Sequence, residues 1–167
     1  IIIPGTKTTV ADLECIRRSG LAEKIVDAAE NGTAVIGICG GYQMLGERLY
    51  DPHGVESDKK SAPGLGLLKT TTLFEREKIT KETKAKITAS ISLLDGAEGM
   101  HVEGYEIHMG ITKSADPFFA ETVSGADGAC SRMRDVFGTY LHGIFDNTCF
   151  TRTLLNNLRK RKGLEPI

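Results

Sequence analysis

A single cysteine between an apolar run and two glycines is the feature of this sequence best suited to chemistry. The run "AVIGIC" ends at Cys39, and Gly40 and Gly41 follow directly. A strand-to-helix turn of this kind is typical of a nucleophile elbow, in which the side chain projects above the carboxyl edge of a sheet. Glycine tolerates the backbone angles and leaves room for a substrate. The N–H groups and dipole of the next helix are expected to favour a thiolate and to bind an oxyanion.

A thiol nucleophile needs a base, and the sequence offers four histidines, which are His53, His101, His108 and His142. His142 ends an apolar, β-prone segment and precedes Gly143. It is therefore expected at the carboxyl end of a strand, where the sites of α/β proteins gather, and is the best partner for Cys39. His53 lies in a turn-rich loop and is expected to be solvated. The competing interpretations are a structural thiol at Cys39 and a structural imidazole at His142.

The elements that would position this pair alternate along the first fifty residues. Residues 1–3 predict a short buried strand, and the apolar periodicity of residues 9–20 and 21–32 predicts two helices. Residues 33–39 lack polar alternation, as in a strand covered on both faces, and residues 40–50 are expected to form a helix. This order favours a parallel sheet with helices on its faces.

The rest of the chain is less regular. Residues 51–68 are rich in turn formers and are expected to loop over the surface, and residues 84–91 alternate as an exposed strand would. Residues 135–145 are apolar and β-prone up to His142. Residues 147–163 predict an amphipathic helix with a basic last turn. Its inward residues are expected to be Phe150, Leu154, Leu155 and Leu158.

Residues 104–114 also alternate in polarity, which predicts a strand with two unlike faces. Glu106 and His108 are expected on one face, opposite Ile107, for which plain packing is the favoured interpretation. The apolar face would carry Tyr105, Ile107, Met109 and Ile111.

Length and composition narrow the class of protein. The 167 residues, 40% of them hydrophobic, fit a single domain over residues 1–167. A net charge of -1 argues against nucleic acid or an anionic membrane as the main partner, and no apolar run could span a bilayer. Four cysteines without a CxxC pair argue against a zinc site or disulfides and favour a reducing cytoplasm. The sequence begins with "IIIPG", which is typical of a buried strand. We therefore expect the chain to be a piece of a longer polypeptide.

Six motifs in order along the chain together resemble the CobQ-type glutamine amidotransferase domain of the cobyric acid synthase family. They are "PGTKTTVADL", "GICGGYQMLG", "DPHGVES", "GLGLL", "GYEIHMG" and "TYLHGIFDN". The resemblance implies a flavodoxin-like class I amidotransferase fold, N-terminally incomplete here, with three α/β/α layers and a mostly parallel sheet. It also implies hydrolysis of glutamine through a cysteinyl thioester, with release of ammonia.

The same resemblance assigns roles to residues. Cys39 would be the nucleophile and His142 the general base and later acid. The Gly40 amide, with a second donor from the loop Gly5–Thr6, would form the oxyanion hole. Gln43 occupies the place that holds the substrate glutamine in related enzymes. The strand that carries Tyr105, Glu106 and His108 is expected to line the site, and neither a metal nor a cofactor is expected in this domain.

The resemblance further implies a partner region, and the sequence departs from the wider class at one position. A synthetase domain, N-terminal in the full enzyme, would use ATP, Mg²⁺ and the ammonia to amidate carboxylates of a corrin, adenosyl-cobyrinic acid a,c-diamide. Class I amidotransferases usually carry a glutamate two residues after the histidine, where this chain has Ile144. We therefore hypothesise that Glu106 or a backbone carbonyl orients the His142 ring.

Four alternatives remain beside this interpretation. Cobyrinic acid a,c-diamide synthase has related motifs but a different elbow and no "GYEIHMG". An amidotransferase acting on a peptidoglycan precursor with a Mur-ligase-like partner shares the elbow and the missing glutamate. A non-catalytic module of the same fold would not need Cys39, Gln43 and His142 together, and a thiol hydrolase or stress protein on a similar sheet would not need the full motif series.

Overall fold

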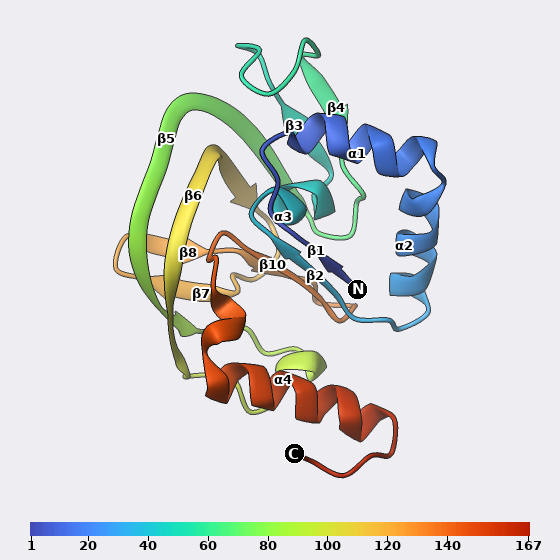
Figure 1. Cartoon of the computed structure of the whole chain (residues 1–167), viewed down its shortest axis with the longest axis vertical. Coiled ribbons are helices and arrows are strands. Elements are labelled where there is room, and N and C mark those ends of the chain that lie inside the picture. Colours follow the sequence, from blue (N-terminus) through green and yellow to red (C-terminus); the bar gives the residue numbers. More distant parts are fainter.

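A four-stranded sheet at the centre of the molecule carries the strand that ends at Cys39 (Figure 1). The structure is a computed structural model and describes residues 1–167. The sheet has the order β1-β2-β10-β9, with β1 and β10 parallel to β2 on either side and β9 antiparallel to β10. Every residue of β2 and β10 is buried, as the absence of polar alternation predicts. The strands are β1 (Ile2–Ile3), β2 (Val35–Ile38), β9 (Ala129–Cys130) and β10 (Val136–Thr139).

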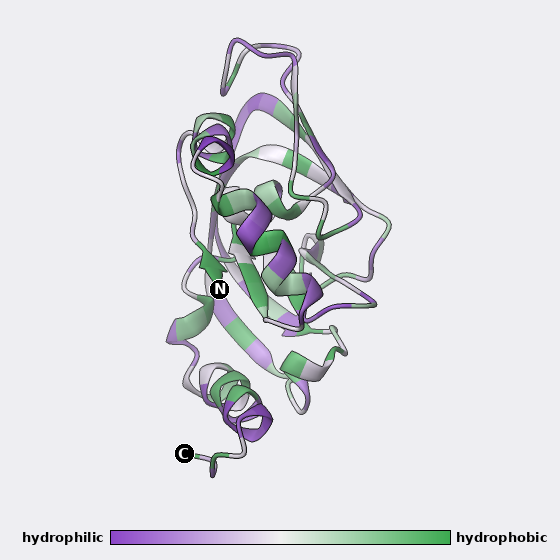
Figure 2. Ribbon diagram, turned by 90° about the vertical axis from the view of Figure 1, so that its right-hand side faces the viewer, coloured by the Kyte–Doolittle hydropathy of each residue, from purple (hydrophilic) through white to green (hydrophobic).

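Three helices of the first fifty residues pack beside this sheet. Helix α2 buries Ala22, Ile25 and Ala29, and its turns alternate between hydrophilic and hydrophobic colours in Figure 2. Helix α3 packs on β2 and β10 and approaches β1 so closely that a Cβ on Gly41 would lie 2.0 Å from the Ile3 carbonyl oxygen. The helices are α1 (Thr9–Arg18), α2 (Leu21–Glu30) and α3 (Gly40–Leu45).

The helix predicted over residues 40–50 ends early, because the chain turns extended at Gly46. A Cβ there would lie 2.6 Å from the Thr70 hydroxyl oxygen, so the turn packs against the next sheet without a side chain. Strand β3 (Arg48–Tyr50) follows, and its Leu49 is fully buried between β4 (Ser61–Pro63) and β5 (Thr70–Ile87).

The second sheet has the order β4-β3-β5-β7-β8, with β6 paired to β5, and apart from the parallel pair β3–β5 it is antiparallel. In Figure 1, β5 and β6 form a long curved ribbon beside the central sheet. The register shifts between Phe74 and Ile79, which marks a bulge on β5. The sequence predicts only the last part of β5. The remaining strands are β6 (His101–Ser114), β7 (Ala120–Thr122) and β8 (Gly125–Asp127).

Strand β6 alternates as predicted, but its polar side chains form the buried face. Glu106 and His108 are 6% and 8% exposed, whereas Tyr105 and Ile107 are 45% and 38% exposed. The expectation that Ile107 packs in the core is therefore wrong. The buried face is polar because its members bond one another, as described below.

The chain ends in helix α4 (Thr148–Arg161), as the amphipathic pattern predicts. Phe150 and Leu154 are buried and Leu158 is partly buried, but Leu155 is 40% exposed, so its inward placement is wrong. None of the helices combines the length and the apolar character needed to cross a bilayer.

Candidate active site

The backbone at Cys39 has the conformation of an elbow. Cys39 directly precedes α3 with φ 51° and ψ -110°, and it is the sole non-glycine residue with positive φ. Such a conformation costs on the order of 1–3 kcal/mol and persists only where its surroundings impose it. Here the parallel strand β2 and the close packing of α3 impose it, so the turn that the sequence predicts is present.

The Cys39 side chain is held as a thiol. Cys39 is buried, and its thiol donates a hydrogen bond to the Ile107 carbonyl oxygen at 3.3 Å. Burial raises the pKa of Cys39 to about 11, the Gly40 N–H lowers it, and the charge of Glu56 raises it further. The prediction that the helix start favours a thiolate is therefore wrong for the resting site, because α3 is short and desolvation outweighs its N–H groups.

His142 follows β10, and strand β6 holds it through the backbone. The His142 N–H donates to the Tyr105 carbonyl at 2.8 Å, and the Tyr105 N–H donates back to the His142 carbonyl at 3.2 Å. The Tyr105 ring stacks on the imidazole with a centroid distance of 5.0 Å and an interplanar angle of 7°. The ring nitrogen Nε2 is buried and has no hydrogen-bond partner in the protein.

The surroundings of the His142 ring disfavour its charged form, and its Nε2 has no partner in the protein. Burial lowers the pKa of His142, the nearby His108 lowers it further, and the Ile107 backbone carbonyl raises it in part. The backbone-carbonyl branch of our hypothesis stays a prediction, and Ile107 is its candidate. The buried Ile144 supplies no carboxylate.

The loop Gly5–Thr6 brings the thiol and the imidazole together. A Cβ on Gly5 would lie 2.9 Å from His142 Cε1 and 3.5 Å from Cys39 Cβ. A Cβ on Gly40 would lie 3.1 Å from the Thr6 backbone nitrogen. The loop Gly5–Thr6 therefore packs directly against the start of α3, where the predicted oxyanion donors lie.

These groups border one cavity of about 500 Å³. Of the predicted site residues, Gly40 and Glu106 are not among those that line it. The lining residues are Gly5, Thr6, Lys7, Thr9, Cys39, Gln43, Glu56, Phe74, Lys78, Tyr105, Ile107, His108, Met109 and His142. No group of three or more His, Cys, Asp or Glu side chains lies close enough to hold a metal ion.

The amide of Gln43 is already paired at both ends. Its Oε1 accepts from the Thr9 hydroxyl at 3.1 Å, and its Nε2 donates to the Tyr140 hydroxyl at 3.1 Å. Gln43 thereby ties α1 to the segment before His142. Each of the two amide atoms keeps one further hydrogen-bonding position, through which the side chain could contact a ligand in the cavity.

Glu106 contacts His108 and does not contact His142. Its Oε2 lies 3.3 Å from His108 Nε2, Lys81 Nζ lies 3.3 Å from Oε1, and the Thr83 hydroxyl donates to Oε1 at 2.8 Å. Burial alone would raise the pKa of Glu106, but the bonds from His108, Thr83 and Lys81 outweigh it and lower that pKa. The branch of our hypothesis in which Glu106 orients the His142 ring is therefore wrong, because Glu106 points to the buried face of β6 whereas the His142 ring stacks on Tyr105, on its other face.

His108 has an acceptor at each ring nitrogen. Its Nδ1 lies 2.9 Å from the Gly110 carbonyl oxygen, while Nε2 faces the Glu106 carboxylate. The ring stacks on Tyr140 with a centroid distance of 3.7 Å, which fixes the imidazole at the wall of the cavity that contains Cys39.

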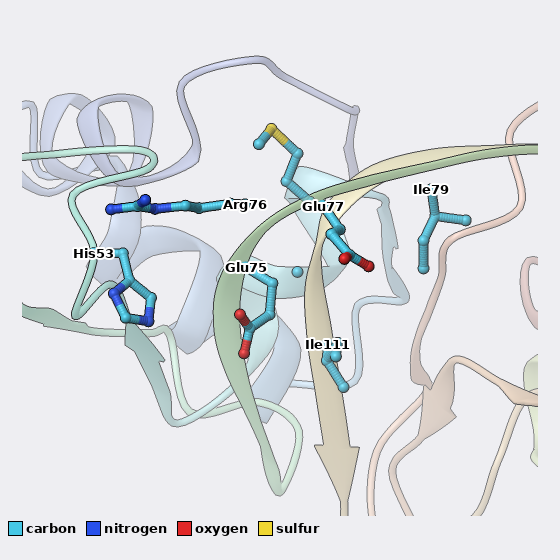
Figure 3. A pocket seen from close by; sticks show the side chains of 8 residues that line it. His53, Glu75, Arg76, Glu77, Ile79 and Ile111 are labelled. Atoms are coloured by element: carbon cyan, nitrogen blue, oxygen red, sulfur yellow. The ribbon is translucent and has the colours of Figure 1, made fainter.

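The remaining histidines lie elsewhere. His53 is exposed, as expected, and borders a separate hollow of about 640 Å³ that β5 and β6 also line (Figure 3). Met109 lines both hollows, so strand β6 separates them. His101 is exposed at the start of β6.

Sequence reasoning missed Lys7, Glu56, Phe74 and Lys78 as lining residues. Glu56 lies within the motif "DPHGVES", which offered a signal, since a carboxylate in a turn-rich loop can be aimed at a site. Nothing local marked Phe74 or Lys78, because the bulge of β5 brings them to the cavity.

A sequence profile of the CobB/CobQ-like glutamine amidotransferase domain matches residues 1–150, which is most of the chain. The chain belongs to this family. It is a glutamine amidotransferase domain with an α/β fold, as the motifs and the alternating elements predict.

Curated relatives agree with this family. Cobyric acid synthase of Dehalococcoides mccartyi strain BAV1 is 49% identical over 98% of this chain, and cobyric acid synthase of Synechocystis sp. strain PCC 6803 is 43% identical over all of it. The matched region is 34% and 33% of those two proteins. The chain thus spans about a third of the length of the curated relatives that it matches.

Solved structures of low sequence identity show the same fold. A glutamine amidotransferase crystal structure superposes with a TM-score of 0.62 at 15% identity, covering 93% of this chain and 77% of the other. The structure of PurLQS from Thermotoga maritima gives a TM-score of 0.60 at 20% identity, covering 83% and 68%.

Proposed function

We propose that this domain hydrolyses glutamine at Cys39 and His142 and supplies the ammonia to a synthetase region of a cobyric acid synthase. The observation that supports it best is the meeting of the two side chains across Gly5, with the Nε2 of His142 free to bond. A thiol, a neutral imidazole and adjacent backbone donors are the groups that acyl transfer from an amide requires.

In the first half of the reaction, Cys39 gives its proton to His142 and its sulfur attacks the carboxamide carbon of glutamine. The carbon–nitrogen bond then breaks, and the imidazolium returns the proton to the leaving ammonia. In the second half, His142 takes a proton from water and the hydroxide attacks the thioester carbon. The carbon–sulfur bond then breaks, glutamate is released, and the imidazolium returns the proton to the Cys39 sulfur.

The amides of Gly40 and Thr6 are the proposed donors to the oxyanion of both steps. Each such donor contributes roughly 3 kcal/mol of transition-state stabilisation in comparable sites. The Ile107 carbonyl accepts from the thiol at rest and is the proposed acceptor for the imidazolium once Cys39 has lost its proton.

The fate of the ammonia is part of the same proposal. The relatives are cobyric acid synthases of which this chain covers about a third. We assign ATP, Mg²⁺ and the corrin carboxylates to the remaining part of such a polypeptide. A reducing cytoplasm is the proposed setting, in which the four free cysteines would stay thiols.

The test is Cys39→Ala in the intact protein. Release of ammonia from glutamine should fall by at least about 1,000-fold, whereas synthesis supplied with free ammonia should continue, because the reacting sulfur alone is lost. Cys130→Ala is the matched control, since Cys130 is also buried and its pKa is also raised to about 11, but it lies outside the cavity. Glutamine turnover that survives in C39A, or that C130A removes equally, would contradict the proposal.

A further inference from the structure

The loop that carries Glu56 is organised by one buried carboxylate. Asp51 is 1% exposed and accepts the N–H groups of Val55, Glu56 and Ser57 at 2.7, 2.8 and 2.8 Å. Burial opposes its ionisation, but these bonds outweigh burial and lower the pKa of Asp51. The motif "DPHGVES" is therefore a fixed turn that sets the position of Glu56.

Half of the Glu56 carboxylate is bound and half is free. Its Oε2 accepts from the Thr9 backbone N–H at 2.9 Å, at the start of α1. Its Oε1 makes no hydrogen bond or ion pair with the protein, although the half-buried side chain lines the Cys39 cavity. A carboxylate in this position can accept from a ligand.

The charge of Glu56 works against the thiolate. Burial raises the pKa of Glu56, and the charges of Asp51 and Asp12 raise it further, while Glu56 in turn raises the pKa of Cys39. In the empty site, the Glu56 carboxylate therefore makes it harder for Cys39 to lose its proton. A bound cation would neutralise it and remove the penalty.

The opposite charge is also present around the cavity. Lys7 and Lys78 line it, and neither forms an ion pair within the protein. One carboxylate and two ammonium groups around a cavity that ends at a thiol match a zwitterionic amino acid with an amide side chain.

We propose that Glu56 binds the α-ammonium group of free glutamine through Oε1, with Lys7 and Lys78 near its α-carboxylate and its carboxamide at Cys39. This inference rests on the proposed function and deepens it. The site then selects a free amino acid over an amide that lacks the ammonium group, and the substrate itself removes the charge that disfavours the thiolate.

The decisive experiment compares L-glutamine with glutaramate, which lacks only the amino group, as substrates of the intact protein and its E56Q variant. Glu56→Gln keeps an oxygen that can accept from the Thr9 N–H, so α1 keeps its partner. We expect kcat/KM for glutamine to fall roughly 10- to 100-fold, mainly through KM. For glutaramate, which cannot neutralise Glu56, kcat/KM should not fall and should rise with the rate of Cys39 alkylation. Asp58→Asn removes an equal charge from the same loop outside the cavity and should change neither value.

Two further measurements separate this inference from the proposed function. Alkylation of Cys39 by iodoacetamide, without glutamine, should be faster in E56Q than in wild type at the same pH. Calorimetric binding of L-glutamine to C39A should weaken by a similar factor when Glu56→Gln is added. A wild-type protein that releases no ammonia would overturn the proposed function, and the binding comparison would still decide this inference. Equal losses for both substrates, or unchanged glutamine affinity, would overturn it.

Discussion

The central sheet and the β5–β6 ribbon both border the site, but they differ in the polarity of the side chains that they bury. In the central sheet the buried strands β2 and β10 are apolar except for Thr139 at the end of β10, and the reactive side chains lie just beyond those strands. In the ribbon, β6 buries Glu106 and His108 and exposes Tyr105, Ile107 and Ile111. A buried face can thus be polar when its members satisfy one another.

The two regions also contribute differently to the chemistry. The central sheet supplies the reactive atoms of Cys39 and His142, whereas the ribbon positions them mainly through its backbone. The Ile107 carbonyl accepts from the thiol, and Tyr105 exchanges two backbone hydrogen bonds with His142. The central sheet should therefore tolerate little change in shape, and the ribbon should tolerate side-chain changes better.

The largest effect that this comparison predicts is at Gly41. In G41A the new Cβ would meet the backbone of Ile3 at 2.0 Å and of Pro4 at 2.9 Å, and neither can move without separating α3 from β1. We expect the free energy of unfolding to fall by about 3 kcal/mol or more. Urea denaturation followed by circular dichroism measures it.

Gly110→Ala is the matched control in the ribbon. Its Cβ would meet Gln43 Nε2 at 2.6 Å and Thr72 Cγ2 at 2.8 Å, which are side-chain and not backbone atoms, so the clash can be relieved by moving Gln43 at the expense of a hydrogen bond. We expect a loss of about 1 kcal/mol. An equal loss in the two variants would remove the proposed difference in rigidity between the regions.

The sequence predicts the central region well because its signals are local. An apolar run, a cysteine and two glycines define the elbow over a few residues, and His142 is recognised by its place at the end of an apolar segment. The pairing of β5 with β6 is hard to predict because it joins residues that are distant in sequence. Residues 70–83 pair with residues 104–114, and alternation in β6 reveals two faces without revealing which is buried.

A smaller effect is expected when the charge of Glu106 is removed. In E106Q the buried His108 and the adjacent Lys81 lose their anionic partner, which should lower the free energy of unfolding by about 2 kcal/mol at pH 7. Glutamine turnover should change less than tenfold, because Glu106 does not contact His142. Kinetics and urea denaturation of the same preparation separate the two effects.

The difference in stability between wild type and E106Q should depend on pH. Because the pKa of Glu106 is lowered in the folded state, its stabilisation is present above the unfolded pKa and is lost as pH falls through the folded pKa. The gap in stability between wild type and E106Q should therefore close in acid. A gap that persists there, or a large loss of turnover at full stability, would place Glu106 in a different role.

The smallest effect is expected at Ile111, which tests the inverted faces of β6 directly. Ile111 is 53% exposed, so Ile111→Thr should change the free energy of unfolding by less than about 0.5 kcal/mol. Val102, on the other face of the same strand, is 1% exposed, and Val102→Thr should cost about 1–2 kcal/mol because a hydroxyl is buried there. Thermal and urea unfolding of both variants gives the ratio. If I111T proved the costlier change, the face of β6 with Tyr105, Ile107 and Ile111 would be the buried one. The alternation would then mark an apolar buried face and a polar exposed face, as it does in most half-buried strands.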